Sequence, residues 1–157
     1  MTLPATPSQT VGPYYAIGLC RRPENELVPD GIPITGRLLD GDGEPIPDGM
    51  IELWSSTAGV WGRCGTQPEG AFRFVAPKPP AAPGEAPRLD VMVFARGLLR
   101  HQLTRLYFPD EQEANGADPV LSSLAPDERA TLVAAAGSDG LRFDIRMQGD
   151  SQTVFFA

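Results

Sequence analysis

Short runs in which apolar and polar residues alternate, separated by proline and glycine, constrain this fold most. In residues 141–147, Leu-Arg-Phe-Asp-Ile-Arg-Met, every second side chain is apolar. Because successive side chains of a β-strand point to opposite faces, this period of two predicts a strand with one buried face. Residues 71–75, Ala-Phe-Arg-Phe-Val, alternate in the same way. Residues 89–95 are almost continuously apolar, which favours a strand in the middle of its sheet.

The remaining elements follow from the same patterns and from turn residues. We expect a helix over 126–136, because Pro126 suits a first helical turn and Gly137 suits a stop. The proline-rich stretch 76–87 can form only a loop. Strands are expected at 34–40, 50–55, 71–75, 89–95, 101–108, 141–147 and 153–156. These elements predict an all-β fold, an antiparallel or mixed β-sandwich with one short helix.

The N-terminal stretch follows neither pattern. Residues 6–15, Thr-Pro-Ser-Gln-Thr-Val-Gly-Pro-Tyr-Tyr, have no apolar period and contain two prolines. Proline fixes φ and extends the residue before it, so we expect a stiff, irregular arm. Because chain ends usually fray unless they are held, we interpret the arm as lying against a partner chain and lining that partner's active site. The predicted division is an arm and loop at 1–33 and a β-sandwich domain at 34–157.

Composition excludes some classes of function. The formal net charge is −7, with 13 Lys and Arg against 20 Asp and Glu, which argues against nucleic acid as a partner. No apolar run approaches the roughly 18–20 residues of a membrane span, and the N-terminus lacks the regions of a signal peptide. Cys20 and Cys64 have no metal-site or redox-motif spacing, which favours free thiols over a disulfide. We expect a cytoplasmic protein.

Motifs of known catalytic chemistry are missing from the sequence. His101 is the one histidine, so the chain cannot build a metal site with two histidine ligands. There is no GxSxG, P-loop or GxGxxG sequence. The acidic pairs Glu111/Glu113 and Asp127/Glu128 are typical of solvated faces and helix starts. The residues alone therefore indicate an acidic β-sandwich with an unusual arm, a subunit of an assembly.

Several separated motifs, in one order along the chain, carry a resemblance to a known family. Together they resemble the α chains of protocatechuate 3,4-dioxygenases, which are intradiol ring-cleaving enzymes, over about residues 6–156. The resemblance implies the transthyretin-like β-sandwich of that family, in agreement with the patterns above. The chain is shorter than the family's pattern around residues 20–33 and 56–70. The motifs are Thr6–Tyr14, Gly36–Gly43, Glu52–Trp54, Phe94–Gly97, Leu103–Phe108, and Arg142–Gly149 with Thr153–Phe156.

The resemblance also implies where a metal is bound. In that family the β chain holds Fe(III) with two tyrosines and a His-x-His pair on a strand. The matching positions here are Arg88 and Asp90. A guanidinium has no lone pair to donate to a metal, and a single carboxylate cannot hold the iron alone. We therefore expect no metal and no catalytic residue in this chain, and Fe(III) in a partner β chain.

What remains for this chain is one wall of a shared substrate pocket. Carried over from the family's motifs, the substrate-binding residues are Thr10, Gly12, Pro13, Tyr14 and Arg96. Arg96 would offset the negative charge of bound protocatechuate. Each residue has an ordinary alternative. Arg96 could pair with an acid at a strand end, Tyr14 could be a buried interface aromatic, and Thr10 could bond to backbone in a turn.

The leading hypothesis is the non-metal subunit of a hetero-oligomer that cleaves protocatechuate with O2 to 3-carboxy-cis,cis-muconate. The alternative is a free-standing transthyretin-like binding or structural domain without catalysis. The single histidine, His101, argues against a self-sufficient iron enzyme.

Overall fold

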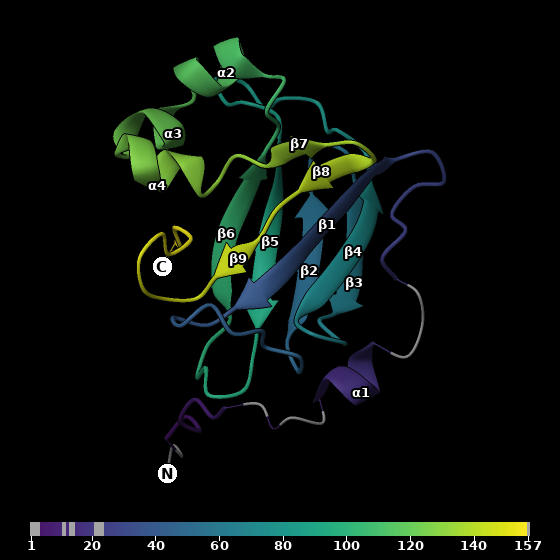
Figure 1. Ribbon diagram of the computed structural model, residues 1–157, viewed down its shortest axis with the longest axis vertical. Helices are drawn as coiled ribbons and strands as arrows, with labels where there is room; N and C mark the ends of the chain where they lie inside the picture. The colour runs from purple at the N-terminus through teal and green to yellow at the C-terminus, as the bar shows by residue number, and fades with distance from the viewer. Residues whose placement is uncertain (1–3, 11, 13–14, 21–23, 157) are drawn as a thin grey trace.

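Two β-sheets face each other in the computed structural model, which describes residues 4–10, 12, 15–20 and 24–156 (Figure 1). The five-stranded sheet has the order β4-β1-β8-β7, with β9 also paired to β1. The four-stranded sheet has the order β3-β2-β5-β6. The strands are β1 (Ile32–Leu39), β2 (Met50–Ser55), β3 (Val60–Gly65), β4 (Ala71–Ala76), β5 (Arg88–Phe94), β6 (Gln102–Tyr107), β7 (Ala135–Gly137), β8 (Gly140–Arg142) and β9 (Ile145–Arg146). The predicted all-β sandwich is confirmed.

The core lies between the two sheets and uses the alternating residues that predicted the strands. Side chains from β2 and β5 meet side chains from β1 and β4. The period of two in 71–75 is confirmed, since Phe72 and Phe74 are buried and Arg73 is exposed. β5 lies between β2 and β6, which confirms its central place in the sheet. Fully buried members of the core include Ile34, Leu38, Ile51, Leu53, Leu89, Val91, Val93 and Ile145.

The five-stranded sheet is mixed, because β1 pairs antiparallel with β4 and parallel with β8 and β9. The predicted strand at 141–147 is present, but it is interrupted between β8 and β9. At the interruption the Asp144 side chain accepts a hydrogen bond from Arg37 N at 2.9 Å, in place of a backbone acceptor. The Phe143 carbonyl lies so close to Gly36 that a Cβ there would be 1.9 Å from it. The interruption therefore requires a glycine on β1.

Two predicted elements were wrong, and one strand was not predicted. β3 was not predicted, since two glycines weaken its alternation, and it forms through pairing with β2, where Trp61 is opposite Trp54. The helix expected over 126–136 ends at Ala130, as α4 (Pro126–Ala130), because the next residues pair with β6: Tyr107 N donates to Leu132 O and Ala134 N donates to Tyr107 O. The expected strand at 153–156 is reduced to one bridge between Phe156 and Leu103.

Four short helices occur in the described ranges, where one was expected. Besides α4 these are α1 (Tyr15–Leu19), α2 (Gln112–Ala117) and α3 (Pro119–Ser123). In Figure 1, α2, α3 and α4 lie together at one end of the sandwich, whereas α1 lies near the opposite end. A small second core under the three grouped helices contains Ala86, Tyr107, Leu121 and Leu132. None of the helices in the described part of the chain is long and apolar enough to cross a membrane.

The stretch before β1 is joined to the sandwich by backbone hydrogen bonds. Arg63 N donates to Glu24 O at 2.8 Å, and Leu27 N donates to Val75 O at 2.8 Å. β1 itself begins at Ile32. The division of the chain at residue 33 stays a prediction.

Candidate functional site

The N-terminal arm contacts the turn that follows β5. Ala95–Leu98 form this turn, in which Leu98 N donates to Ala95 O at 3.3 Å and Gly97 has a φ of 85°. A positive φ at the third position of a turn favours glycine. Thr10 Oγ1 accepts a hydrogen bond from Gly97 N at 2.9 Å. The arm and the Phe-Ala-Arg-Gly motif are therefore in direct contact.

Arg96 lies in the same turn and pairs with an acid from another loop. Its Nε lies 3.2 Å from Oδ2 of Asp48, in the connection between β1 and β2. The two partners differ in exposure, since the Arg96 side chain is 66% exposed and the Asp48 side chain is 12% exposed. The strand-end ion pair that the sequence left open is therefore present. It leaves most of the Arg96 side chain accessible to solvent.

Tyr15 joins α1 to the same end of β5. Its hydroxyl donates a hydrogen bond to Phe94 O at 2.7 Å. Burial, and then the negative charge of Asp48, raise the pKa of Tyr15 above its ordinary value. The phenol therefore stays protonated at neutral pH, as its role as a donor requires.

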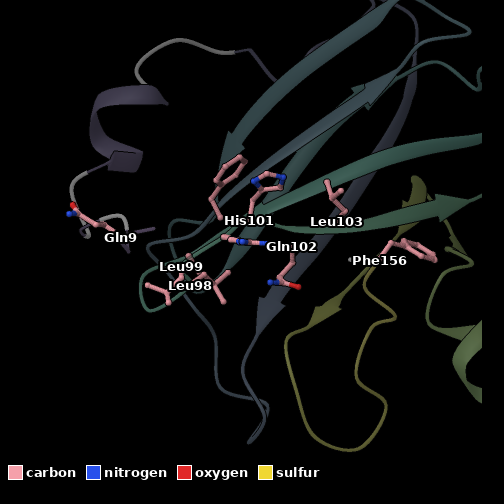
Figure 2. A pocket seen from close by; sticks show the side chains of 10 residues that line it. Gln9, Leu98, Leu99, His101, Gln102, Leu103 and Phe156 are labelled. Carbon is pink, nitrogen blue, oxygen red and sulfur yellow. The ribbon is translucent and has the colours of Figure 1, made fainter. Parts of the chain in front are cut away.

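A cavity of about 620 Å³ opens beside this turn, and the side chains that line it are mostly apolar. Figure 2 shows Gln9 of the arm at one end, Phe156 at the other, and Leu98 and Leu99 between them. His101 also lines the cavity, and its ring centroid lies 5.5 Å from that of Phe94. The arm thus forms part of a cavity wall, together with the loop between β5 and β6.

The structure brings together some of the predicted substrate-binding residues. Thr10 contacts the residue next to Arg96, although 86 positions separate Thr10 from Arg96 in the numbering of the chain. Gly12 is exposed, and its carbonyl accepts a hydrogen bond from Tyr15 N at 3.3 Å. Pro13 and Tyr14 lie outside the described residues. The substrate-binding role of all five residues stays a prediction.

The positions that match the family's iron ligands carry a network of ion pairs. Asp90 Oδ1 lies 3.3 Å from Arg88 Nε and 3.7 Å from Arg105 Nε. Arg88 also pairs with Glu85, in the proline-rich loop. The two guanidinium groups already neutralise the single carboxylate, and they would repel a metal cation. Because neither has a lone pair to donate, this set of side chains does not fit an iron ion. Over the described ranges, no three His, Cys, Asp or Glu side chains are grouped as a metal site requires.

Two residues near the arm were missed by sequence reasoning. Asp48 sits in a Pro-Asp-Gly sequence that reads as an ordinary turn, and only the fold shows that it is buried against Arg96. Gln9 belongs to the arm motif, but nothing in its residue type indicates a cavity wall. Tyr107 is a buried sheet residue whose hydroxyl donates to Asp118 Oδ1 at 3.3 Å.

Comparison with known proteins places these features in a family. The chain is 39% identical to a protocatechuate 3,4-dioxygenase alpha chain from Burkholderia cepacia, over 99% of this chain and 98% of the relative. It is 34% identical to the alpha chain from Pseudomonas putida, over 98% and 96% of the two chains. A beta chain from Burkholderia cepacia is 26% identical over 82% of this chain and 68% of that relative.

Solved structures agree on the fold. The dioxygenase domain of a dioxygenase–carbohydrate-binding protein fusion from Streptomyces sp. SirexAA-E has a TM-score of 0.60 at 23% identity, covering 92% of this chain and 98% of that one. Hydroxyquinol 1,2-dioxygenase from Pseudomonas putida DLL-E4 has a TM-score of 0.55 at 16% identity, covering 93% and 63%. No family model matches the sequence. The identity to the two alpha chains, over nearly their whole length, shows that this chain belongs to the protocatechuate 3,4-dioxygenase alpha-chain family of intradiol dioxygenases.

Proposed function

We propose that this chain is the non-metal α subunit of a cytoplasmic, heteromeric protocatechuate 3,4-dioxygenase, and that it supplies part of the substrate pocket. The observation that carries the proposal is the contact between Thr10 and Gly97, which holds the arm beside Arg96. Two motifs that the family places at one substrate pocket are thus neighbours in this chain. The similarity to both alpha and beta chains supports an enzyme of two homologous subunits.

The division of labour follows from the residues of this chain. Fe(III), held by the β chain, supplies the activation of the catechol that lets O2 cleave the ring to 3-carboxy-cis,cis-muconate. The part of this chain is to bind and orient. The Arg96 guanidinium offsets the charge of the anionic substrate, and the arm covers the pocket and excludes water. Thr10 keeps the arm next to Arg96.

The free thiols support the proposed location. Cys20 and Cys64 are both unbridged. Burial raises the pKa of each thiol, so both stay largely protonated and weakly reactive at neutral pH. This agrees with a reducing compartment such as the cytoplasm.

The test is to purify this chain alone, the β chain alone, and the co-expressed pair, and to measure iron content and O2 consumption with protocatechuate. We expect a stable complex, iron in proportion to the β chain, and activity in the complex. Iron or ring cleavage in the isolated chain would contradict the proposal. Failure to bind the β chain, with a homo-oligomer in its place, would favour the free-standing domain.

A matched variant tests the metal assignment within this chain. Asp90→Asn removes the carboxylate at a position that matches an iron ligand, while it keeps the shape of the side chain. We expect the complex with Asp90→Asn to retain its full iron content. A loss of iron per mole of complex, with assembly with the β chain unchanged, would assign a metal role to Asp90 and contradict the proposal.

A further inference from the structure

Asp48 is a buried carboxylate whose surroundings require an explanation. It precedes β2 and is 8% exposed. The loop around it is fixed by hydrogen bonds, since Gly49 N donates to Thr66 Oγ1 at 2.8 Å and Thr66 N donates to Gly49 O at 3.1 Å. Burying a carboxylate is costly unless it is paired and hydrogen-bonded. Because the Asp48 carboxylate is held in a fixed place, a cation that pairs with it is also restrained.

Only one of the two Asp48 carboxylate oxygens is paired. Oδ2 of Asp48 lies 3.2 Å from Arg96 Nε, whereas Oδ1 is buried and has no hydrogen-bond donor in the described part of the chain. The nearby Tyr15 hydroxyl donates to Phe94 O. Oδ1 of Asp48 is therefore still available as a hydrogen-bond acceptor. A guanidinium can donate two parallel N–H groups to the two oxygens of one carboxylate, so Arg96 could engage Oδ1 as well.

The asymmetry of burial separates this pair from an ordinary surface ion pair. In the Arg142–Asp144 pair, the side chains are 58% and 36% exposed. In the Arg96–Asp48 pair, only the arginine is exposed, at 66%, and the acid is fixed in the fold. The buried acid therefore restrains the exposed cation at its Nε, while most of the Arg96 side chain stays accessible to solvent.

We propose that Asp48 is a positioning residue for Arg96, which holds the guanidinium ready to meet the carboxylate of the aromatic substrate in the assembled enzyme. This inference rests on the proposed function. An arginine that is already ordered loses less conformational entropy when substrate binds. Asp48 acts through Arg96 and has no contact of its own with substrate. Its loss should therefore weaken binding of the carboxylate-bearing ring specifically.

The test uses Asp48→Asn in the co-expressed complex with the β chain. We expect KM for protocatechuate to rise about 2- to 10-fold with little change in kcat. Catechol, which has the same ring without the carboxylate, should be unaffected as a substrate or as a competitive inhibitor. Asp144→Asn is the matched control, since it removes an acid from an exposed arginine pair, and it should leave both values unchanged.

A double-mutant cycle distinguishes a positioning role from a structural one. If Asp48 acts through Arg96, Asp48→Asn should have no further effect in an Arg96→Ala background. Equal effects on protocatechuate and catechol, or additive effects of the two substitutions, overturn the inference. Normal protocatechuate kinetics in Asp48→Asn, with impaired kinetics in Arg96→Ala, overturn the inference and leave the proposed function intact. Normal kinetics in Arg96→Ala overturn the proposed pocket as well.

Arg96→Lys provides a test that does not disturb the buried site. Lysine keeps the positive charge, but its compact ammonium lacks the planar fork in which one nitrogen pairs with Asp48 while two others, at a fixed angle, are left for the substrate. We expect KM for protocatechuate to rise about 2- to 10-fold in this variant also. A KM equal to that of the unmodified complex overturns the inference, whether or not Asp48→Asn assembles.

Discussion

Thr10 Oγ1 accepts a hydrogen bond from the backbone N–H of Gly97 at 2.9 Å, across 87 positions of the chain. The bond links the irregular arm to the turn at the end of β5, and it uses the residue directly after Arg96. An arm that would otherwise fray is held at one of its polar side chains. The placement of the arm therefore depends in part on a hydroxyl group.

Replacing Thr10 with valine removes this acceptor while keeping the shape of the side chain. In the assembled enzyme we expect kcat/KM for protocatechuate to fall about two- to tenfold, since one hydrogen bond contributes about 0.5–1.5 kcal/mol. Thr10→Ser keeps the hydroxyl and should retain most of the activity. Iron content should be the same in both variants. Equal activity of the valine and serine variants would contradict a role for the hydroxyl.

Arg96→Ala should have a larger effect on the assembled enzyme. A hydrogen bond to a charged group contributes about 1.5–3 kcal/mol, so kcat/KM should fall about 10- to 150-fold while iron content is retained. Arg37→Ala is the control, because it removes an exposed cation of β1 that pairs with Glu69. Steady-state kinetics with protocatechuate measure both. Unchanged kinetics in Arg96→Ala would restrict Arg96 to its ion pair with Asp48.

The sandwich could be predicted because its strands bury every second side chain. This alternation of apolar and polar residues can be read within a short run of sequence. Phe72, Phe74 and Ile145 all lie in the core as their spacing indicated. β3 could not be predicted in this way, because its pairing with β2 depends on the partner strand. The helix over 126–136 failed for a related reason, since Leu132 and Ala134 bond to Tyr107 of β6 instead of continuing the helix.

Site residues could be predicted only where they belong to a motif of the family. Thr10 and Arg96 were named through the family resemblance, and the structure brings their segments together. Asp48 could not be found, because nothing local marks an acid as buried when the residues that bury it are distant in the sequence. The network of Arg88, Asp90 and Arg105 was likewise hidden, since it joins two neighbouring strands.

Gly97→Ala should destabilise the turn that presents Arg96. Gly97 has a φ of 85°, and an added Cβ would meet nothing within 4 Å, so the cost is backbone strain of about 1–2 kcal/mol. Gly116 in α2 is a matched control, because it also has open space but no positive φ, and alanine there should stabilise by about 0.5–1 kcal/mol. Urea unfolding of the two variants should give shifts of opposite sign. Shifts of the same sign would contradict this account.

Asp90→Asn should reduce stability more than a surface substitution does. It leaves Arg88 and Arg105 facing a neutral group, and both are largely buried. We expect a loss of about 1–3 kcal/mol in the free energy of unfolding. Asp144→Asn, in an exposed pair with Arg142, keeps an oxygen that can accept from Arg37 N and should change it by less than about 0.5 kcal/mol. Equal losses would mean that the network on β5 and β6 contributes no more than a surface pair.

Alkaline pH should destabilise the chain through its buried tyrosines. Burial raises the pKa of both Tyr15 and Tyr107 above the ordinary value of 10.0. Above about pH 10 the unfolded chain releases these phenolic protons while the folded chain keeps them, so the unfolded state binds fewer protons and stability falls as pH rises. The stabilising effect of the neutral phenols is fully present below that pH.

The free energy of unfolding, measured with urea between pH 8 and 11, should decline by up to about 1.4 kcal/mol per pH unit for each such tyrosine. Tyr15→Phe should be less stable at pH 8, because it loses the hydrogen bond to Phe94 O, but its decline above pH 10 should be shallower. Tyr107→Phe should behave in the same way, since its hydroxyl donates to Asp118. An unchanged slope in both variants would assign the alkaline loss of stability to other groups.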